Sequence, residues 1–459
     1  MSVLVKKVFI LRFKDLDKWQ IPHAGLVPAS LPKGWKIARI TDFARQVTDR
    51  VRVESGKLYR MLGVKWYSKG VFLRETVNGD SMSATWVTPA KLGAFIYNRL
   101  FAWKESFAVV PSEFADCFVS GEFPQFTLDA AQVSAEYLYL FFRLRSVIRA
   151  VNTASAGSAA VSRNRFKEEE FLRIELPVPP IETQRAILAQ WRKAQAEIAA
   201  AERTVDQLIE DRDMVFCERI GLAVDAPVTQ RGAFVLRLKE MERWDTFFYR
   251  PDFVSLDRRL RDMRAKPLGE LLRFITRHWS PEEFPSGEFQ YIEISGVSKE
   301  EGIIAAHPVG IEKAPSRATT LVKTGDILIS TTRPYLGAHA RVPQKYDGCV
   351  CSSGFALADR VASDAIDPDY IVFFLKSAPG LRQMERRMTG GLYPAIVQAE
   401  LEKVMVPLPP ISIQRESMKE VETFRVQIAR ERETARQIAE RIEADLEAWL
   451  LGNKEINGD

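Results

Sequence analysis

Four short stretches of the chain combine basic residues with aromatic or polar side chains in loop-like surroundings: KWYSKG from Lys65, NRLFAWK from Asn98, RHW from Arg277 and STTRPYLG from Ser330. Lys and Arg side chains contact phosphates and guanine edges, Asn suits adenine, and aromatic rings stack or pack against the sugar-phosphate wall. The sequence therefore predicts DNA contacts at Lys65, Trp66, Tyr67, Lys69, Asn98, Arg99, Lys104, Arg277, His278, Trp279, Thr331, Thr332, Arg333 and Tyr335.

An ordinary exposed loop with solvated charges and a half-buried aromatic ring remains the alternative for each stretch taken singly. The strongest of the four contains Arg333 and Tyr335, because these residues directly follow the β-like run Ile327–Ser330. A loop that leaves a strand has a rigid base, which suits a binding role.

Motifs for enzymatic chemistry are missing from the sequence. It contains no GxxxxGK[ST] loop for nucleotide phosphates and no GxGxxG after a strand for a dinucleotide. No NPP[YF]-type tetrapeptide of an amino-methyltransferase occurs, since VPP and LPP are each followed by Ile at a helix entry, and the SGF and SGEF segments lack a GxSxG elbow. We therefore expect a non-enzymatic protein.

The histidines and cysteines are not spaced in the sequence as metal ligands are. The 4 histidines (His23, His278, His307 and His339) show no HExxH or other ligand spacing, and we expect them to be surface or capping residues. The 4 cysteines (Cys117, Cys217, Cys349 and Cys351) include no CxxC pair, which favours buried reduced thiols. The sequence predicts no metal site.

The chain carries an internal repeat from end to end. FILRFKDLDKW (Phe9–Trp19) matches FVLRLKEMERW (Phe234–Trp244) at an offset of 225 residues. Four further matches follow in the same order: LGAFIYN with TGDILIS, VPSEFADC with VPQKYDGC, YLYLFF with YIVFFL, and LPVPPIETQR with VPLPPISIQR. Five ordered matches indicate two copies of one unit.

Each copy ends in a proline-rich hinge followed by a long helical segment. The apolar positions alternate at spacings of three and four, which is typical of a coiled-coil seam. The predicted pairing residues are Trp191, Ile198, Val205, Leu208, Val421, Phe424, Ile428 and Ile438, and Arg212, Glu431 and Asp445 interrupt the seam. Because such helices leave one apolar stripe in water when alone, we expect them to pack antiparallel; docking of another protein on the seam is the alternative.

The globular copies mix short β-like and helical runs separated by Gly, Pro and Ser. The predicted fold class is therefore α/β or α+β, with two tandem globular domains joined by two long helices that form an antiparallel coiled coil with pseudo-twofold internal symmetry. The expected segments are domain 1 at 1–175, hinge and first helix at 176–221, linker and domain 2 at 222–405, and hinge and second helix at 406–459.

Composition narrows the functional classes. With 459 residues, of which 46 % are hydrophobic, the chain has room for more than one core. The net charge of +5 permits a polyanionic partner, and residues 1–100 hold about 18 Lys and Arg against about 7 Asp and Glu. No apolar run reaches the roughly 18 to 20 residues of a membrane span, and the N-terminus does not resemble a secretory signal, so we expect a cytoplasmic protein without membrane partners.

At LPVPPIETQR and VPLPPISIQR, each preceded by a divergent copy and followed by a long helix, the sequence resembles the specificity subunits of type I restriction-modification systems. The resemblance covers essentially the whole chain. It departs from the usual pattern at Thr183 and Ile413, where an acidic residue commonly precedes the Gln, so capping of the helix entry could differ.

The resemblance implies two target-recognition domains, each of which reads one half of a bipartite double-stranded DNA sequence, with the helices measuring the spacer. It also implies two partner modification subunits that methylate adenine with S-adenosylmethionine, and, in systems that have them, restriction subunits that use ATP and magnesium. This chain itself would hold no cofactor. A helix of about 35 residues spans roughly 50 Å, or roughly 15 base pairs. A coiled-coil scaffold whose globular ends bind proteins is the alternative, because the second copy is nearly neutral.

Overall fold

The computed structural model describes residues 30–155, 165–222 and 241–456. The chain forms two compact units: unit 1 comprises Met1–Ala201 with Glu433–Asp459, and unit 2 comprises Glu202–Arg432. Each unit therefore includes one stretch of each long helix, whereas the sequence assigned these helices to segments of their own. The repeated segment Phe9–Trp19 lies outside the described residues, as does most of its counterpart.

The described part of unit 1 contains sheets with the strand orders β1-β11, β2-β10-β7-β8 and β3-β6-β9-β4-β5. The strands are β1 (Lys36–Arg39), β2 (Ala44–Gln46), β3 (Val51–Arg52), β4 (Leu58–Val64), β5 (Val71–Asn78), β6 (Trp86–Pro89), β7 (Phe95–Tyr97), β8 (Phe107–Val109), β9 (Phe118–Val119), β10 (Gln125–Leu128) and β11 (Glu175–Val178). The short helices are α1 (Ile40–Phe43), α2 (Ala135–Phe141), α3 (Arg145–Ala154) and α4 (Glu168–Leu172).

The described part of unit 2 contains sheets with the orders β12-β23, β13-β22-β19-β20, β17-β14-β21-β18 and β15-β16. The strands are β12 (Lys266–Pro267), β13 (Leu272–Ile275), β14 (Glu288–Ile292), β15 (Val297–Ser298), β16 (Gly302–Ile303), β17 (His307–Gly310), β18 (Ala318–Leu321), β19 (Ile327–Ser330), β20 (His339–Arg341), β21 (Val350–Ser352), β22 (Phe355–Val361) and β23 (Met405–Val406). The short helices are α6 (Pro251–Asp262), α7 (Leu268–Leu271), α8 (Pro368–Lys376), α9 (Ala378–Arg387) and α10 (Gln398–Leu401).

The same strand order occurs in both units. β2-β10-β7-β8 corresponds to β13-β22-β19-β20, and β6-β9-β4-β5 corresponds to β18-β21-β14-β17, including a parallel pair at the same place. The connections differ: β4 leads into β5 by a short turn, whereas the path from β14 to β17 includes the extra hairpin β15–β16. The structure confirms the predicted mixture of strands and helices.

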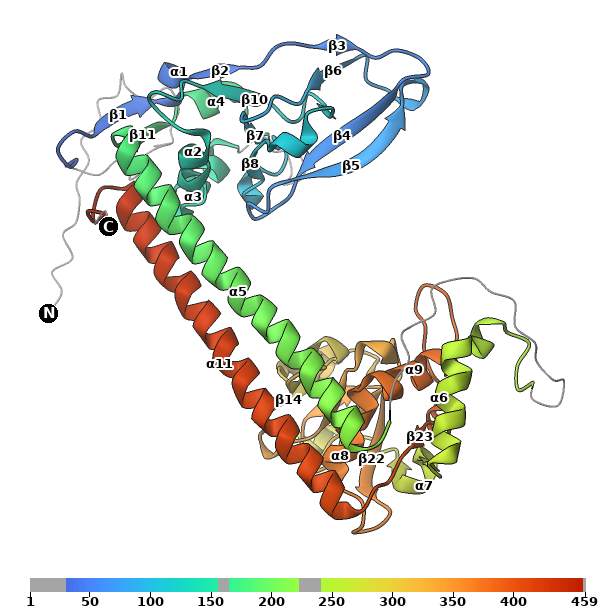
Figure 1. The fold of residues 1–459 in the computed structure, drawn as a ribbon. Coiled ribbons are helices and arrows are strands. Elements are labelled where there is room, and N and C mark those ends of the chain that lie inside the picture. The colour runs from blue at the N-terminus through green and yellow to red at the C-terminus, as the bar shows by residue number, and fades with distance from the viewer. Residues whose placement is uncertain (1–29, 156–164, 223–240, 457–459) are drawn as a thin grey trace, which may run out of the picture. The chain divides into compact units, whose positions relative to one another are not determined.

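The two long helices, α5 (Ile181–Arg219) and α11 (Ile411–Leu450), lie side by side within each unit (Figure 1). In unit 1, Ile187 and Leu188 near the start of α5 share a hydrophobic core with Leu446 near the end of α11. In unit 2, Phe216 near the end of α5 shares a core with Val421 near the start of α11. The helices therefore run in opposite directions and pack together, as the seam predicted.

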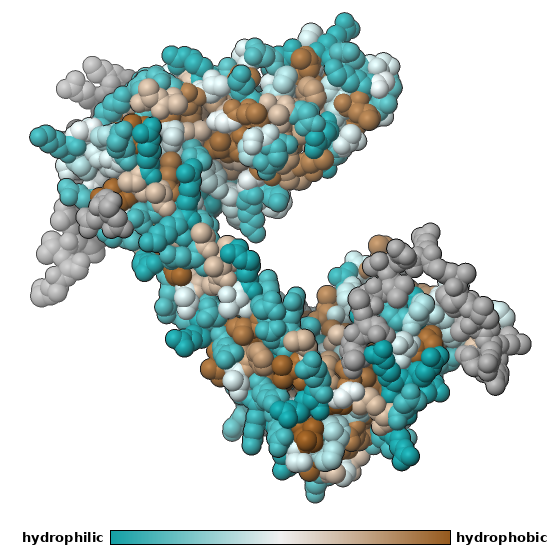
Figure 2. All heavy atoms as spheres, in the orientation of Figure 1, coloured by the Kyte–Doolittle hydropathy of each residue, from teal (hydrophilic) through white to brown (hydrophobic). Residues whose placement is uncertain are grey.

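The predicted pairing residues lie on the packed side of these helices. Val205, Val421 and Ile428 are buried, and the other five are half-buried: Trp191, Ile198, Leu208, Phe424 and Ile438. Arg212 is buried as well, although it interrupts the apolar seam. The visible faces of both units are mostly hydrophilic, with hydrophobic residues in small groups between them (Figure 2).

A glutamine in each hinge joins the long helix to its globular part. Gln184 accepts a hydrogen bond from the N-cap residue of α2 at 3.0 Å and donates one to the carbonyl of Pro179 at 3.0 Å. Gln414 makes the same bonds to the N-cap residue of α8 at 2.9 Å and to Pro409 at 2.8 Å. Both glutamines are buried, so the helix entry is anchored in the same way in both units.

Candidate nucleic-acid interface

Two of the four predicted stretches occupy the same position in the two units. NRLFAWK follows β7 and forms a 3-10 turn at Ala102–Lys104, and STTRPYLG follows β19 and forms a 3-10 turn at Pro334–Leu336. β7 and β19 are corresponding strands. Each turn ends at a residue in the left-handed conformation, Glu105 with φ 57° and Gly337 with φ 70°. We call the turns with their flanks, residues 98–106 and 330–338, the recognition turns.

In unit 1 a third stretch, KWYSKG, lies directly against the recognition turn. The backbone N–H of Tyr67 donates to the carbonyl of Lys104 at 2.8 Å, and that of Ser68 donates to Glu105 at 2.8 Å. The Tyr139 hydroxyl donates to the Ser68 carbonyl at 2.6 Å. These bonds hold Tyr67 and Ser68 at φ 56° and 50°, a conformation that side-chain-bearing residues rarely adopt. The structure therefore brings two predicted stretches together.

The two segments create an exposed surface of aromatic rings and positive charge. The ammonium group of Lys104 lies 3.7 Å from the centre of the Trp66 ring, and Trp66 packs against Phe101 with ring centres 5.1 Å apart. Trp66 is 41 % exposed and Tyr67 is 58 % exposed. A hollow of about 520 Å³ lies beside them, and its lining includes Lys65 and Lys69. Such a surface can bind a ligand that carries both anionic groups and flat rings.

Asn98 and Arg99, by contrast, are held inside the recognition turn of unit 1. Asn98 is buried and accepts a hydrogen bond from the backbone N–H of Leu100 at 3.0 Å. Arg99 forms an ion pair with Glu168 and is only partly exposed. Their polar groups shape the turn, so in this conformation they present little to a ligand.

In unit 2 the recognition turn packs against a second loop that the sequence did not single out, residues 388–397. Thr332 forms a β-bridge with Ala395, and the backbone N–H of Arg333 donates to the carbonyl of Pro394 at 2.8 Å. The guanidinium carbon of Arg333 lies 5.1 Å from the centre of the Tyr393 ring. Thr331 is fixed from the other side, because its hydroxyl donates to Gly354 at 2.9 Å.

The tip of loop 388–397 is unusually exposed for its composition. Leu392 is 88 % exposed and Tyr393 is 73 % exposed, and Tyr335 on the recognition turn is 38 % exposed. Exposed apolar side chains of this size commonly mark binding surfaces. The Gly-Gly-Leu-Tyr sequence between α9 and α10 could have indicated an exposed loop. No local pattern, however, connects it with the recognition turn of unit 2, some 60 residues earlier. The corresponding segment of unit 1 includes residues 156–164, which lie outside the described residues.

The fourth stretch, RHW, serves mainly to hold unit 2 together. Arg277 pairs with Asp326 at 2.5 Å and donates to the carbonyl of Leu321 at 3.2 Å. The indole N–H of Trp279 donates to Ala318 at 2.7 Å. His278 is exposed and forms a β-bridge with Thr320, so of the three it alone presents an open side chain.

The position of His339 in the structure differs from the sequence prediction. His339 was expected at the surface or in a cap, but it is fully buried on β20, where its Nδ1 accepts a hydrogen bond from the backbone N–H of Ser330 at 3.1 Å. Burial lowers its pKa to about 3, so the ring stays neutral. The corresponding β8 position in unit 1 is Phe107, which shows that this site is part of a core.

All four cysteines are buried and unpaired. Burial raises the pKa of Cys217 and of Cys351 to about 12, which removes their nucleophilic character at neutral pH. Among the described residues, no group of three or more His, Cys, Asp and Glu side chains is arranged to hold a metal ion. Within the same residues, the helices lack the combined length and apolar character of a membrane span.

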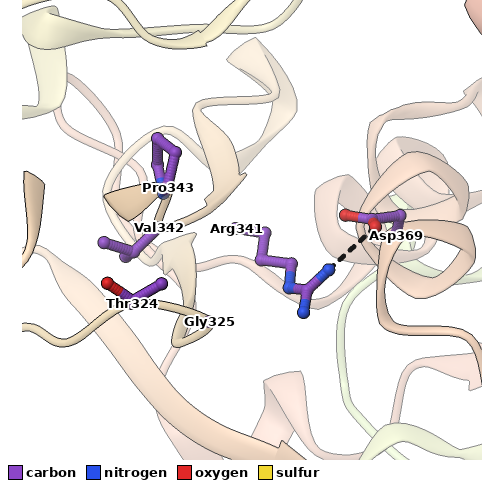
Figure 3. A pocket seen from close by; sticks show the side chains of 6 residues that line it. All are labelled: Thr324, Gly325, Arg341, Val342, Pro343 and Asp369. Carbon is purple, nitrogen blue, oxygen red and sulfur yellow. Dashed lines mark hydrogen bonds and ion pairs between the residues drawn. The ribbon is translucent and has the colours of Figure 1, made fainter. Parts of the chain in front are cut away.

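A further hollow of about 360 Å³ in unit 2 lies between β20 and α8. Its lining includes Arg341 and Asp369, which form an ion pair at 2.9 Å (Figure 3). The remaining lining is Thr324, Gly325, Val342 and Pro343. Since the only charges here are paired with each other, this hollow is a poorer candidate than the recognition turns.

Neither a family model nor a curated protein matches the chain. A solved structure described as showing complex assembly and conformational transition of the type I R-M system matches it at TM-score 0.55 and 18 % identity, covering 93 % of this chain and 100 % of that one. The HsdS subunit from Thermoanaerobacter tengcongensis (TM-score 0.42, 18 % identity, 93 % and 99 % covered) and the S subunit from M. genitalium (0.43, 13 %, 92 % and 97 %) also align. By the first of these matches, the chain shares the fold of a type I R-M system component over nearly its whole length.

Proposed function

We propose that this protein is the DNA-sequence-recognition subunit of a type I restriction-modification complex. The observation that carries the proposal is the recurrence of one recognition turn, with cationic and aromatic side chains, at the same place in both units. The fold shared with a type I R-M structure and the sequence resemblance support the same function. In this role the chain binds DNA and catalyses nothing itself.

Under this proposal each recognition turn contacts one half of a bipartite target. Two modules on one chain make the second contact intramolecular, so affinity multiplies only when both half-sites are present at the right spacing. The turns differ in chemistry: unit 1 offers Trp66 and Lys104, and unit 2 offers Arg333 and Tyr393. The two halves of the target should therefore differ in sequence, which gives an asymmetric site.

The chemistry of the complex would belong to the partners. We place S-adenosylmethionine in two modification subunits that dock beside the long helices, and ATP with magnesium in restriction subunits where these exist. The exposed faces of α5 and α11, which are rich in Glu, Arg and Gln, are available for such docking. The cytoplasm is then the expected location, because the genomic DNA is there.

The test is DNA binding by the full-length chain, alone and with co-expressed modification subunits. Methylome sequencing of the host with and without the gene identifies the target, and fluorescence anisotropy then measures affinity for that duplex. Arg333→Ala and Lys104→Ala should each weaken specific binding about 10-fold or more, since a good contact to a base is worth roughly 1–3 kcal/mol. The matched control is Lys313→Ala, an exposed cation of unit 2 outside the recognition turns.

The salt dependence of duplex binding distinguishes this function from that of a protein-binding scaffold. A DNA reader must lose affinity for random duplex steeply as salt rises, because phosphate contacts release counterions. A chain that binds no duplex at low salt, and whose deletion leaves the methylome unchanged, would refute the proposal in favour of the scaffold.

A further inference from the structure

A buried ion pair links the long helices to the recognition turn in unit 2. Arg212 of α5 is 3 % exposed, and its Nη1 donates to Glu300 at 2.5 Å, at the tip of the hairpin β15–β16. Its Nε and Nη2 donate to Asp213 at 3.0 and 2.7 Å. The same hairpin tip, residues 297–303, brings Lys299 to within 3.8 Å of Asp213. We call these residues the tip hairpin.

The tip hairpin also packs against the strand that follows the recognition turn. Val297 and Ile303 share a hydrophobic core with Ala338 and Ala340, the latter on β20. Gly337, the residue that ends the turn, lies so close to the side chain of Lys299 that an added Cβ would approach its Cγ to 2.8 Å. A continuous path of contacts therefore runs from α5 through the tip hairpin to the recognition turn.

The seam position of Arg212 is filled differently in the other unit. Gln184 and Gln414 fix an offset of 230 residues between the two helices, so Arg212 on α5 corresponds to Ile442 on α11. Ile442 is buried in the core of unit 1, where an aliphatic side chain fits the seam. In unit 1 the place of the tip hairpin is taken by the short turn between β4 and β5, which contains no acidic residue.

Stability alone does not account for Arg at this position. Replacing a buried ion pair with well-packed apolar residues is often neutral or stabilising, because two charges must be withdrawn from water. The ion pair instead fixes an orientation. Because the guanidinium of Arg212 is bonded to both Glu300 and Asp213, it holds the tip hairpin in one geometry against α5. An aliphatic residue would leave that geometry free.

We propose that Arg212 and Glu300 are positioning residues that hold the recognition turn of unit 2 at a fixed orientation on the helices, and thereby restrict the spacing between half-sites that the protein accepts. The inference rests on the proposed DNA-reading function. One added base pair moves a half-site by about 3.4 Å and rotates it by about 35°, so only a reader that is held stiffly penalises the change.

The test compares the wild type, Arg212→Ile, Glu300→Gln and the double variant, each as the full-length chain. Arg212→Ile copies the residue of the corresponding position in unit 1, and the double variant also removes the charge of Glu300 that this change leaves unpaired. The matched control is Arg432→Gln, which removes the exposed ion pair of 2.9 Å between α11 and Glu301 of the same hairpin. Affinity is measured for duplexes with the methylome-defined spacing and with one base pair added or removed.

The wild type and the control should lose about 10-fold or more in affinity when the spacing changes by one base pair. Arg212→Ile, Glu300→Gln and the double variant should lose less than about threefold, while their affinity for the single unit 2 half-site stays within about twofold of wild type. Equal spacing penalties in all proteins would overturn the inference, as would losses of half-site affinity as large as the change in spacing preference.

Hydrogen exchange provides a readout that does not depend on DNA. The amide of Ile304, which donates to Gly296 at 2.9 Å across the base of the hairpin, should exchange faster in Arg212→Ile than in the control. Unchanged exchange would refute the link between helix and hairpin. A wild type that binds no DNA but shows the faster exchange in the variant would refute the proposed function while leaving the link standing.

Discussion

The phenolic hydroxyl of Tyr370 on α8 donates a hydrogen bond of 2.8 Å to the carbonyl oxygen of Pro407, at the entry to α11. Tyr137 on α2 makes the same bond, at 2.9 Å, to Pro177 before α5. Both tyrosines are completely buried. The two bonds fasten corresponding helices to corresponding hinges, although the loops around them have diverged.

Removing either hydroxyl should therefore destabilise its unit to a similar degree. Tyr370→Phe and Tyr137→Phe each leave a buried carbonyl without its donor, which costs about 1–3 kcal/mol in the free energy of unfolding. Urea denaturation followed by tryptophan fluorescence measures the loss. Tyr335→Phe, at an exposed tyrosine of the recognition turn, is the control and should change stability by less than about 0.5 kcal/mol. A loss no larger than that of the control would contradict the prediction.

The helix seam gives a second prediction. Ile428→Asp places an unpaired carboxylate at a buried position of α11 and should lower the free energy of unfolding by about 3 kcal/mol or more. Ile198→Asp, at a half-buried seam position of α5, should have a smaller effect, and either change should weaken assembly with the modification subunits. Val426→Asp lies two residues from Ile428 but is 62 % exposed, so it tests the charge without the burial. Equal losses for Ile428→Asp and Val426→Asp would disprove packing on this face.

His339 should make unit 2 sensitive to acid. Burial, reinforced by the nearby charge of Lys376, lowers its pKa to about 3 from the ordinary 6.5. Below pH 6.5 the unfolded chain therefore binds a proton at His339, whereas the folded chain does not. The contribution of the neutral histidine to the free energy of unfolding is complete above pH 6.5. It is lost as the pH falls towards 3, by about 1.4 kcal/mol per pH unit.

His339→Phe copies Phe107 and removes this dependence. At pH 7.5 the N–H of Ser330 loses the imidazole but keeps the carbonyl of Ala338 at 3.2 Å, so the variant should lose no more than about 1 kcal/mol. Relative to the wild type, the variant should gain about 1 kcal/mol or more in stability when the pH is lowered to 5.5. Denaturation at the two pH values measures this, with the exposed His278→Gln as control. A difference independent of pH would rule out the buried neutral histidine.

Lys376 should make the stability of unit 2 depend on pH in the alkaline range. Burial and the charge of Arg425 lower its pKa to about 8 from 10.5, with Arg212 and Lys299 adding to the effect and Glu300 opposing it. The folded state therefore releases a proton that the unfolded state keeps, and stability rises as the pH goes from 8 to 10.5.

Lys376→Met should accordingly stabilise unit 2 by about 3 kcal/mol at pH 7, and the gain should diminish towards pH 10. The measurement is thermal or urea unfolding at both pH values, with the exposed Lys313→Met as the control. A variant that is less stable than the wild type at pH 7 would mean that the ammonium group is held by favourable contacts.

The sequence predicted those features that depend on local patterns. The proline hinges, the alternating seam and the ordered matches between the two copies each lie within short segments, so they could be recognised without coordinates. For the same reason, the stretches from Asn98 and from Ser330 could be recognised as loops: each directly follows a strand that both copies share.

Pairings between distant residues could not be predicted in this way. Arg99 and Arg277 looked available for DNA, but they are paired with Glu168 and Asp326, which lie 69 and 49 positions further along the chain. Loop 388–397 was missed because its contact with residues 330–338 depends on the bridge between Thr332 and Ala395. Nothing in the composition of either segment identifies its partner.

The difference between Arg212 and Ile442 also bears on chimaeras made by exchanging parts of the two copies. A chimaera that carries the residue of Ile442 at position 212 but keeps the tip hairpin leaves the Glu300 carboxylate without its guanidinium partner. Helix segment and hairpin should therefore be transplanted together, as one cassette.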